Sequence, residues 1–259
     1  FAGNGTASLI DGQGTEASFN KPTNIAIDSS GNLYVSEYGS SSIRKITPDA
    51  NVTTFAGTGS RGSNNGQGTS ASFDRPYGLV FDSSSNLYVG DYGNHVIRKI
   101  DPSGNVTTFA GMMDSSGFSD GQGTSASFYG PVGLTIDPQG NLYVTDQLNH
   151  SIRMIDPSGK VTTIAGTGSE GSADGIGDQS SFNVPYGILS DEIGNLLVAD
   201  LVNHTIRKIN LVGETINFRV DFANAAANSG SVDNTTDNSL VKVDLEAPFI
   251  LNDSITSTN

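Results

Sequence analysis

One segment of this chain recurs four times, and the repeat limits the possible folds more than any other feature. Corresponding segments begin at prolines spaced 54, 55 and 54 residues apart, namely Pro22, Pro76, Pro131 and Pro185. A second marker keeps the same steps, at Asn32, Asn86, Asn141 and Asn195. Self-similarity at a fixed period of this length is typical of solenoids and propellers.

Each repeat contains four short apolar runs separated by turn residues. In the second repeat these runs cover residues 78–81, 86–90, 95–100 and 106–110. They are too short for helices and rich in Val, Ile, Tyr, Phe and Thr, which indicates strands.

An Asp opens the turn between the first two runs in every repeat, at Asp28, Asp82, Asp137 and Asp191. Asp accepts hydrogen bonds from the backbone ahead of it, so the turns predict hairpins. In the second repeat Ser85 stands where the other turns have Gly, which predicts strain or a shifted turn. Four strands per repeat make one propeller blade.

The residues of each unit resemble the NHL repeat. Along the chain, that repeat contains a proline, an apolar strand, an Asp, a Gly-Asn pair, a second strand like residues 142–146, an Asn-His pair and an Ile-Arg-Lys segment. The match covers residues 1–210 and departs in unit one, where Ser40 and Ser41 replace Asn-His. The resemblance implies a ring that is generally six-bladed. We therefore predict an all-β propeller of four visible NHL-type repeats, either four-bladed or part of a six-bladed ring. The units lie near 22–57, 76–111, 131–166 and 185–212.

Both ends of the chain offer an outer strand for unit four. Residues 1–3 match the end of a fourth strand, which predicts that they close the propeller domain of residues 1–212. Residues 213–259 are predicted to form a short β-rich extension with strands near 214–220 and 240–245. Because 214–220 also fits the outer strand of unit four, either segment could close the ring.

Charge and composition limit the partners. The formal net charge is -14, and an acidic surface repels phosphate backbones and anionic lipid. No apolar run approaches the roughly 18–20 residues that span a bilayer. We therefore expect neither nucleic acid nor membrane insertion. The Thr, Ser, Asn and Gly content, with only 15% charged residues, favours an extracellular or cell-surface location.

The recurring polar residues are expected to serve the scaffold. Three histidines share one register, at His95, His150 and His204, and four arginines share another, at Arg44, Arg98, Arg153 and Arg207. The acids expected to pair with the arginines stand on the neighbouring strand, at Glu37, Asp91, Asp146 and Asp200. Equal residues in equal units argue against a specialised site, so we predict no catalytic, cofactor or metal residues. Calcium is the alternative at the Asp/Asn-Gly positions 11, 65, 120 and 174, although each such position offers one acid at most.

Two further sets of residues are candidates for modification and assembly. Seven Asn-x-Ser/Thr sequons occur, at Asn4, Asn51, Asn105, Asn149, Asn203, Asn234 and Asn252, and Asn51 and Asn105 are the best glycosylation candidates because they stand at hairpin tips. The predicted C-terminal strands could add to the exposed sheet edge of a neighbour. Their assembly candidates are Ile216, Phe218, Val220, Leu240, Val241, Val243 and Leu245.

These observations favour a non-catalytic extracellular binding or structural module, and the C-terminal strands favour a subunit of a surface or filamentous assembly. Its partners would be copies of itself or adjoining modules of a longer chain, with glycans as a further possibility. The alternatives are a propeller enzyme of the metal-dependent hydrolase or lyase type, and a receptor domain that senses a ligand or glycan. An active site usually breaks the symmetry of a repeat, so unequal residues would be its mark.

Overall fold

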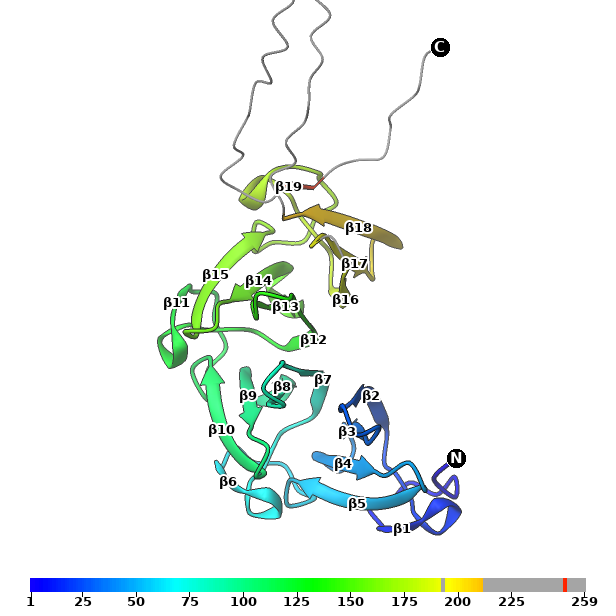
Figure 1. The fold of residues 1–259 in the computed structure, drawn as a ribbon. Helices are drawn as coiled ribbons and strands as arrows, with labels where there is room; N and C mark the ends of the chain where they lie inside the picture. Colours follow the sequence, from blue (N-terminus) through cyan, green and yellow to red (C-terminus); the bar gives the residue numbers. More distant parts are fainter. Residues whose placement is uncertain (192–193, 212–248, 251–259) are drawn as a thin grey trace, which may run out of the picture.

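The computed structural model describes residues 1–191, 194–211 and 249–250, and its strands form four antiparallel sheets. We call these sheets blades 1 to 4 in chain order (Figure 1). Blade 1 contains β1 (Gly12–Gln13), β2 (Pro22–Ile27), β3 (Leu33–Glu37), β4 (Ser42–Ile46) and β5 (Asn51–Ala56). Blade 2 contains β6 (Gly66–Gln67), β7 (Pro76–Phe81), β8 (Leu87–Asp91), β9 (Val96–Ile100) and β10 (Asn105–Ala110).

Blade 3 contains β11 (Gly121–Gln122), β12 (Pro131–Ile136), β13 (Leu142–Asp146), β14 (Ser151–Ile155) and β15 (Lys160–Ala165). Blade 4 contains β16 (Pro185–Ser190), β17 (Leu196–Asp200), β18 (Thr205–Asn210) and β19 (Phe249–Ile250). The described 3-10 helices are η1 (Gly14–Glu16), η2 (Gly68–Ser70), η3 (Tyr92–Asn94), η4 (Gly123–Ser125), η5 (Gln147–Asn149) and η6 (Gly177–Gln179). None of the described helices is long and apolar enough to cross a bilayer.

The hairpins form where the sequence predicts them. Between β12 and β13, Oδ1 of Asp137 accepts hydrogen bonds from the N–H groups of Gln139 at 3.0 Å and Asn141 at 2.8 Å. In blade 2, Ser85 takes the left-handed conformation with φ of 63°, and its N–H still donates to the carbonyl oxygen of Asp82 at 3.1 Å. The turn is therefore not shifted, and the left-handed position is filled by a residue that resists it more than Gly does.

The core lies between the blades rather than inside one of them. The cluster between blades 1 and 2 joins Tyr34 and Ile43 of blade 1 to Phe73 and Leu79 of blade 2. The next two junctions repeat this packing, with Phe128 and Phe182 in the place of Phe73. All three of these phenylalanines stand shortly before a repeat proline and are fully buried, so they anchor neighbouring blades to each other.

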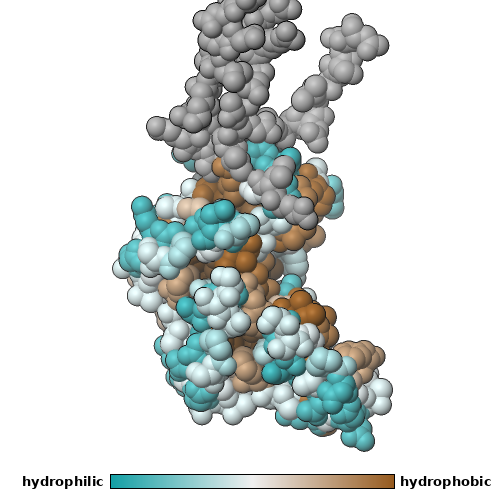
Figure 2. Space-filling model, viewed as in Figure 1, coloured by the Kyte–Doolittle hydropathy of each residue, from teal (hydrophilic) through white to brown (hydrophobic). Residues whose placement is uncertain are grey.

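The four blades stand around an axis as an open arc. Their innermost strands follow one another as β2, β7, β12 and β16, and the arc leaves a gap between blade 1 and blade 4 (Figure 1). Figure 2 shows that apolar residues gather on the inner side of this arc. The four-bladed arrangement confirms the predicted all-β propeller fold.

The predictions about the ends of the chain concern residues 1–3 and residues 213–259. Residues 1–3 lie outside the described strands, and the N–H of Gly3 donates to the carbonyl oxygen of Gly14 at 2.9 Å, so closure by this segment stays a prediction. In blade 4, β19 pairs with β18, with Ile250 opposite Ile209 and Phe249 opposite Asn210. The strands predicted near 214–220 and 240–245 lie outside the described residues.

Candidate functional site

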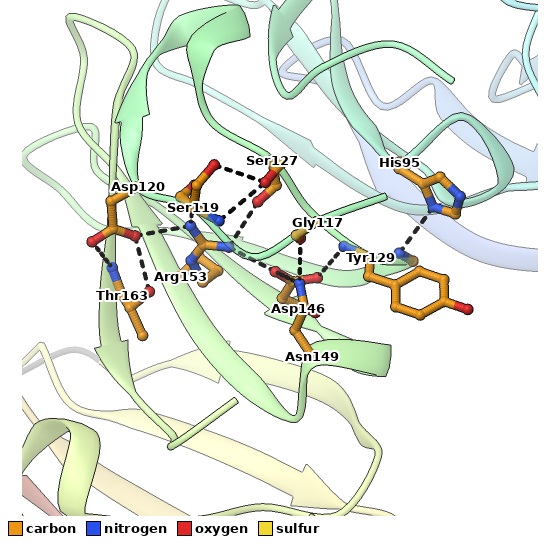
Figure 3. A network of polar contacts seen from close by, with 11 residues as sticks. His95, Gly117, Ser119, Asp120, Ser127, Tyr129, Asp146, Asn149, Arg153 and Thr163 are labelled. Carbon is orange, nitrogen blue, oxygen red and sulfur yellow. Dashed lines mark hydrogen bonds and ion pairs between the residues drawn. The ribbon is translucent and has the colours of Figure 1, made fainter. Parts of the chain in front are cut away.

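Each blade contains a buried arginine that ties three parts of the chain together, and Figure 3 shows the one in blade 3. Nη1 of Arg153 lies 2.7 Å from a carboxylate oxygen of Asp146, and Nη2 lies 2.9 Å from one of Asp120. The guanidinium also donates to the carbonyl oxygens of Ser119 and Ser127 and lies 5.1 Å from the centre of the Phe128 ring. Because a buried charge needs partners, this network holds the linker against the sheet.

The same network recurs in the other blades, which confirms the predicted acid–arginine pairs. The pairs are Glu37–Arg44 at 3.2 Å, Asp91–Arg98 at 2.9 Å and Asp200–Arg207 at 3.0 Å. The second partner of each arginine was not predicted from the sequence. It comes from the Asp/Asn-Gly loops, at Asp11, Asn65, Asp120 and Asp174. Their side chains bind the arginines, so these loop positions contribute to the scaffold.

In two of these networks, burial and the hydrogen-bonding partners act in opposite directions on the pKa of the buried acid. Burial raises the pKa of Asp91 to about 6, while Arg98 and the hydrogen bond from Asn94 oppose the shift. Burial likewise raises the pKa of Asp146. Asn149 donates to the same Asp146 carboxylate at 2.8 Å, and Asn94 and Asn203 donate to Asp91 and Asp200 at the same distance. Such groups stabilise a sheet and offer no free acid or base.

Two of the histidines link neighbouring blades. Nδ1 of His95 accepts a hydrogen bond from the N–H of Gly130 at 3.2 Å, and Nδ1 of His150 accepts one from the N–H of Val184 at 3.1 Å. In blade 1, Oγ of Ser41 takes this place and accepts from the N–H of Arg75 at 3.3 Å. Burial and the nearby charge of Arg75 lower the pKa of His95. These contacts agree with the predicted structural role of the histidines.

The turn aspartates are also engaged in the scaffold. Besides the two backbone N–H groups of its turn, Asp137 accepts a hydrogen bond from the amide of Asn141 at 2.8 Å and one from the hydroxyl of Tyr143 at 2.9 Å. Asp28 and Asp82 bind their own Asn and Tyr in the same way. Among the described residues no group of His, Cys, Asp and Glu side chains could hold a metal ion.

A tyrosine cluster at the beginning of the innermost strands breaks the symmetry of the repeat. The ring of Tyr77 on β7 is surrounded edge-to-face by Tyr38 at 5.5 Å, Tyr92 at 5.7 Å and Tyr186 at 5.8 Å between ring centroids. Tyr77 and Tyr186 come from blades 2 and 4, and β12 of blade 3 lies between their strands. The contact therefore reaches across the inner side of the arc.

Cations border this cluster. Arg75 lies with its guanidinium carbon 5.4 Å from the centre of the Tyr92 ring, and Nζ of Lys21 lies 5.8 Å from that of Tyr38. Burial and hydrogen bonding with Tyr77 raise the pKa of Tyr186, so its hydroxyl stays protonated at neutral pH. Together these rings and cations present hydroxyl groups and aromatic edges that are half-buried.

The sequence carries a signal for this cluster, which lies in the unequal positions of the repeat. The residue after the repeat proline is Thr23, Tyr77, Val132 or Tyr186 in the four units. The residue after the second strand is likewise unequal, being Tyr38, Tyr92, Gln147 or Leu201. Positions at which otherwise equal units differ therefore mark these tyrosines in the sequence.

The structure separates the glycosylation candidates into two groups. Asn51 and Asn105 stand at the first positions of β5 and β10, where Asn51 is exposed and Asn105 is half-buried. Asn149 and Asn203 form the second group. Their Nδ2 atoms, to which a glycan would be attached, donate to Asp146 and Asp200 at 2.8 Å in the folded state, and Asn149 is buried. Asn4 is exposed.

The remaining candidates cannot be placed in the fold. Asn234, Asn252 and all seven assembly candidates lie outside the described residues. Assembly through residues 216–245 stays a prediction, as does glycosylation at the two unplaced sequons.

Comparison with known proteins agrees with the repeat. The family model described as "NHL repeat" matches residues 128–153. NHL repeat-containing protein 2 of Bos taurus is 36% identical over 177 residues, which are 62% of this chain and 24% of that protein. Protein SUPPRESSOR OF QUENCHING 1, chloroplastic, of Arabidopsis thaliana is 30% identical over 227 residues, which are 82% of this chain and 22% of that protein.

Solved structures agree with the fold. An auxiliary nutrient binding protein of Bacteroides ovatus matches with a TM-score of 0.60 and 24% identity, covering 76% of this chain and 49% of that one. The chain thus spans about half the length of that structure and less than a quarter of the curated relatives. The recurring Asn-His and Ile-Arg positions, the four-stranded blades and these matches agree, and the chain belongs to the NHL-repeat family.

Proposed function

We propose that this chain is a non-catalytic binding module that works outside the cell and contacts a protein partner through its tyrosine cluster. The cluster consists of Tyr38, Tyr77, Tyr92 and Tyr186 with the adjoining Tyr129. The observation that carries the proposal is that these aromatic rings gather at one place from unequal positions of otherwise equal repeats.

The difference between residues that recur in every blade and residues that do not supports this proposal. The recurring arginines, their acids and the turn aspartates are occupied with hydrogen bonds inside the fold, as Arg153 and Asp137 illustrate. A residue that serves the scaffold is needed in every blade, whereas a contact residue is needed once. Tyr77 and Tyr186 have Thr and Val at the same position in blades 1 and 3, so packing of a blade does not require tyrosine there.

The chemistry of the cluster suits protein recognition. A tyrosine offers a large rigid ring and a hydroxyl group with little loss of conformational freedom, which explains its enrichment at interfaces. Lys21 and Arg75 add positive charge beside the rings on a chain whose net charge is -14. A partner segment with apolar or aromatic side chains next to carboxylates would match both features.

Location outside the cell rests on composition and on the sequons. Asn51 is exposed and its side chain makes no hydrogen bond within the described part of the chain, so a glycan could be attached to it without disturbing β5. If the chain is expressed behind a secretory leader in eukaryotic cells, peptide mass spectrometry should find glycans on Asn51 and Asn105. A glycan on Asn149 would require its two hydrogen bonds to break, so none is expected there.

The binding role can be tested with a phage-displayed peptide library selected on the native chain. Individual selected peptides are then measured by calorimetry against the native chain and a Tyr77→Ala/Tyr186→Ala variant. Truncating a tyrosine at the centre of an interface costs about 2 kcal/mol or more, so affinity should fall at least about 30-fold. Lys160→Ala, at an exposed position of β15, is the control and should bind like the native chain.

Two results would contradict the proposal. One is that the library yields no peptide above background. The other is that the selected peptides bind the double variant as tightly as the native chain, which would place the contact elsewhere. A glycan array on the same three proteins addresses the other ligand class, and tyrosine-dependent binding there alone would replace a protein partner by a carbohydrate.

A further inference from the structure

The loop residue that binds the buried arginine differs in blade 2 from its equivalents in the other blades. It is an aspartate in blades 1, 3 and 4, at Asp11, Asp120 and Asp174. In blade 2 it is Asn65, whose Oδ1 accepts a hydrogen bond from Nη2 of Arg98 at 2.8 Å. One of four equivalent positions thus carries an amide where the other three carry a carboxylate.

The backbone around Asn65 matches the backbone around the aspartates. In every blade the next residue is Gly, and in blades 1 to 3 it pairs with a Val of the fourth strand. The pairs are Gly12 with Val52, Gly66 with Val106 and Gly121 with Val161. The side chain at this position therefore meets the same kinds of partner in each of these blades.

In blade 3 both oxygens of the carboxylate are used, as Figure 3 shows. Oδ1 of Asp120 accepts from Nη2 of Arg153 at 2.9 Å and from Oγ1 of Thr163 at 2.9 Å. Oδ2 accepts from the backbone N–H of Thr163 at 3.1 Å. In blade 1 burial acts to raise the pKa of Asp11, but hydrogen bonds from the backbone of Thr54 and from Arg44 lower it. A carboxylate thus satisfies a cation on one side and a backbone donor on the other.

An amide can satisfy only one of these two sides. Oδ1 of Asn65 takes the contacts of the aspartate Oδ1, with Nη2 of Arg98 at 2.8 Å and Oγ1 of Thr108 at 3.3 Å. This leaves Nδ2, which is a donor, where Asp120 offers Oδ2 to a backbone N–H. Turning the amide over would bring Nδ2 to the guanidinium, which has donors alone. In either orientation two donors face each other.

Asn65 also stands where hydrolysis of its amide is favoured. Gly66 has no Cβ that would hinder attack of its backbone nitrogen on the side chain before it. Asn65 is exposed to water, and β6 is a two-residue strand at the edge of its sheet, so it can open locally. We propose that Asn65 is a deamidation site and that its conversion to aspartate completes the arginine network of blade 2.

The reaction needs water as its co-reactant. The backbone nitrogen of Gly66 forms a bond to Cγ of Asn65, and the bond from Cγ to Nδ2 breaks. Nδ2 leaves as ammonia with the proton of the Gly66 nitrogen. Water then adds to Cγ of the cyclic imide, the bond from Cγ to the Gly66 nitrogen breaks, and this nitrogen regains a proton. Addition of water to the main-chain carbonyl carbon gives isoaspartate instead, which lengthens the main chain in front of β6.

The aspartate product gains contacts that the amide lacks. One carboxylate oxygen would accept from Arg98 and the other from the N–H of Thr108, as in blade 3. Within the described residues Arg98 has one carboxylate partner, Asp91 at 2.9 Å, whereas Arg153 has two. The conversion would give Arg98 its second. The longer main chain of isoaspartate displaces the carboxylate, so only the aspartate product meets both partners.

Substitutions test the energetic part of the proposal. Asn65→Asp should raise the urea midpoint and lower the equilibrium constant of unfolding about three- to tenfold, a modest factor because the position is exposed. The reciprocal Asp120→Asn should raise that constant by a similar factor. Asn4→Asp is the control with the same change of charge. Asn4 is exposed, also precedes a Gly and accepts from the N–H of Thr6 at 2.8 Å, so its midpoint should stay at the native value.

Incubation of the native chain at mildly alkaline pH tests the chemical part. One sample stays folded and a second is unfolded in guanidinium chloride, and peptide mapping follows the replacement of the amide NH₂ by OH at position 65. Synthetic peptides identify aspartate and isoaspartate by chromatography. The folded sample should yield aspartate at this position, and the converted fraction should unfold at higher urea.

Three results would overturn the proposal. One is that Asn65 stays intact in the folded chain after the unfolded sample has converted. Another is that the folded chain yields isoaspartate alone. The third is that Asn65→Asp is no more stable than the native chain, which would show that the amide serves Arg98 as well as a carboxylate does.

Discussion

Replacing Arg153 by Met tests whether the arginine networks hold the blades together. Met keeps most of the aliphatic length but removes the guanidinium, which is fully buried between Asp146 and Asp120. Asp146, itself fully buried, would then be left as a charge without its counterion. Removing one partner of a buried ion pair costs about 3–5 kcal/mol. For a domain of about 200 residues each kcal/mol shifts the unfolding midpoint by about 2–4 °C, so we expect a decrease of roughly 6–20 °C.

The measurement is urea and thermal unfolding followed by circular dichroism, since the chain contains no Trp. Lys160→Met is the matched control at an exposed position and should change stability by no more than about 0.5 kcal/mol. Adding Asp146→Asn to Arg153→Met should recover part of the loss, because it removes the uncompensated charge. A loss below about 1 kcal/mol for Arg153→Met would refute the reasoning, since a buried carboxylate cannot lose its counterion so cheaply.

Three further predictions concern single contacts. Gly133→Ala should destabilise the chain strongly in urea unfolding, because its Cβ would lie 2.2 Å from the carbonyl oxygen of Tyr186; a midpoint equal to the native one would contradict this packing. Tyr143→Phe removes the hydroxyl that donates to Asp137 at 2.9 Å and should cost about 1 kcal/mol in the same assay. The pKa of His95 is lowered by folding below its ordinary 6.5, so the folded state binds fewer protons than the unfolded state and loses stability as pH falls through that window. His95→Gln should lose less stability than the native chain between about pH 7.5 and about pH 5.

Much of the fold could be predicted from the sequence because a blade is a local structure. Hairpins are determined by residues a few positions apart, as with Asp137 and the Asn141 amide that it binds. The acid–arginine pairs were predictable for the same reason, since Asp146 and Arg153 stand on adjacent strands joined by a short turn. A period of 54 or 55 residues then places equal residues at equal positions in each blade.

The tertiary structure alone decided which residues from different parts of the repeat meet. Asp120 reaches Arg153 from 33 residues away, and Tyr77 meets Tyr186 across the inner side of the arc. Whether Ile25 and Ile206 are covered depends on which blade faces them, so the same residue type is buried at one junction and exposed at the end of the arc. Strand pattern and turn chemistry act along the chain, whereas burial and contact between blades are set by how whole sheets pack around the axis.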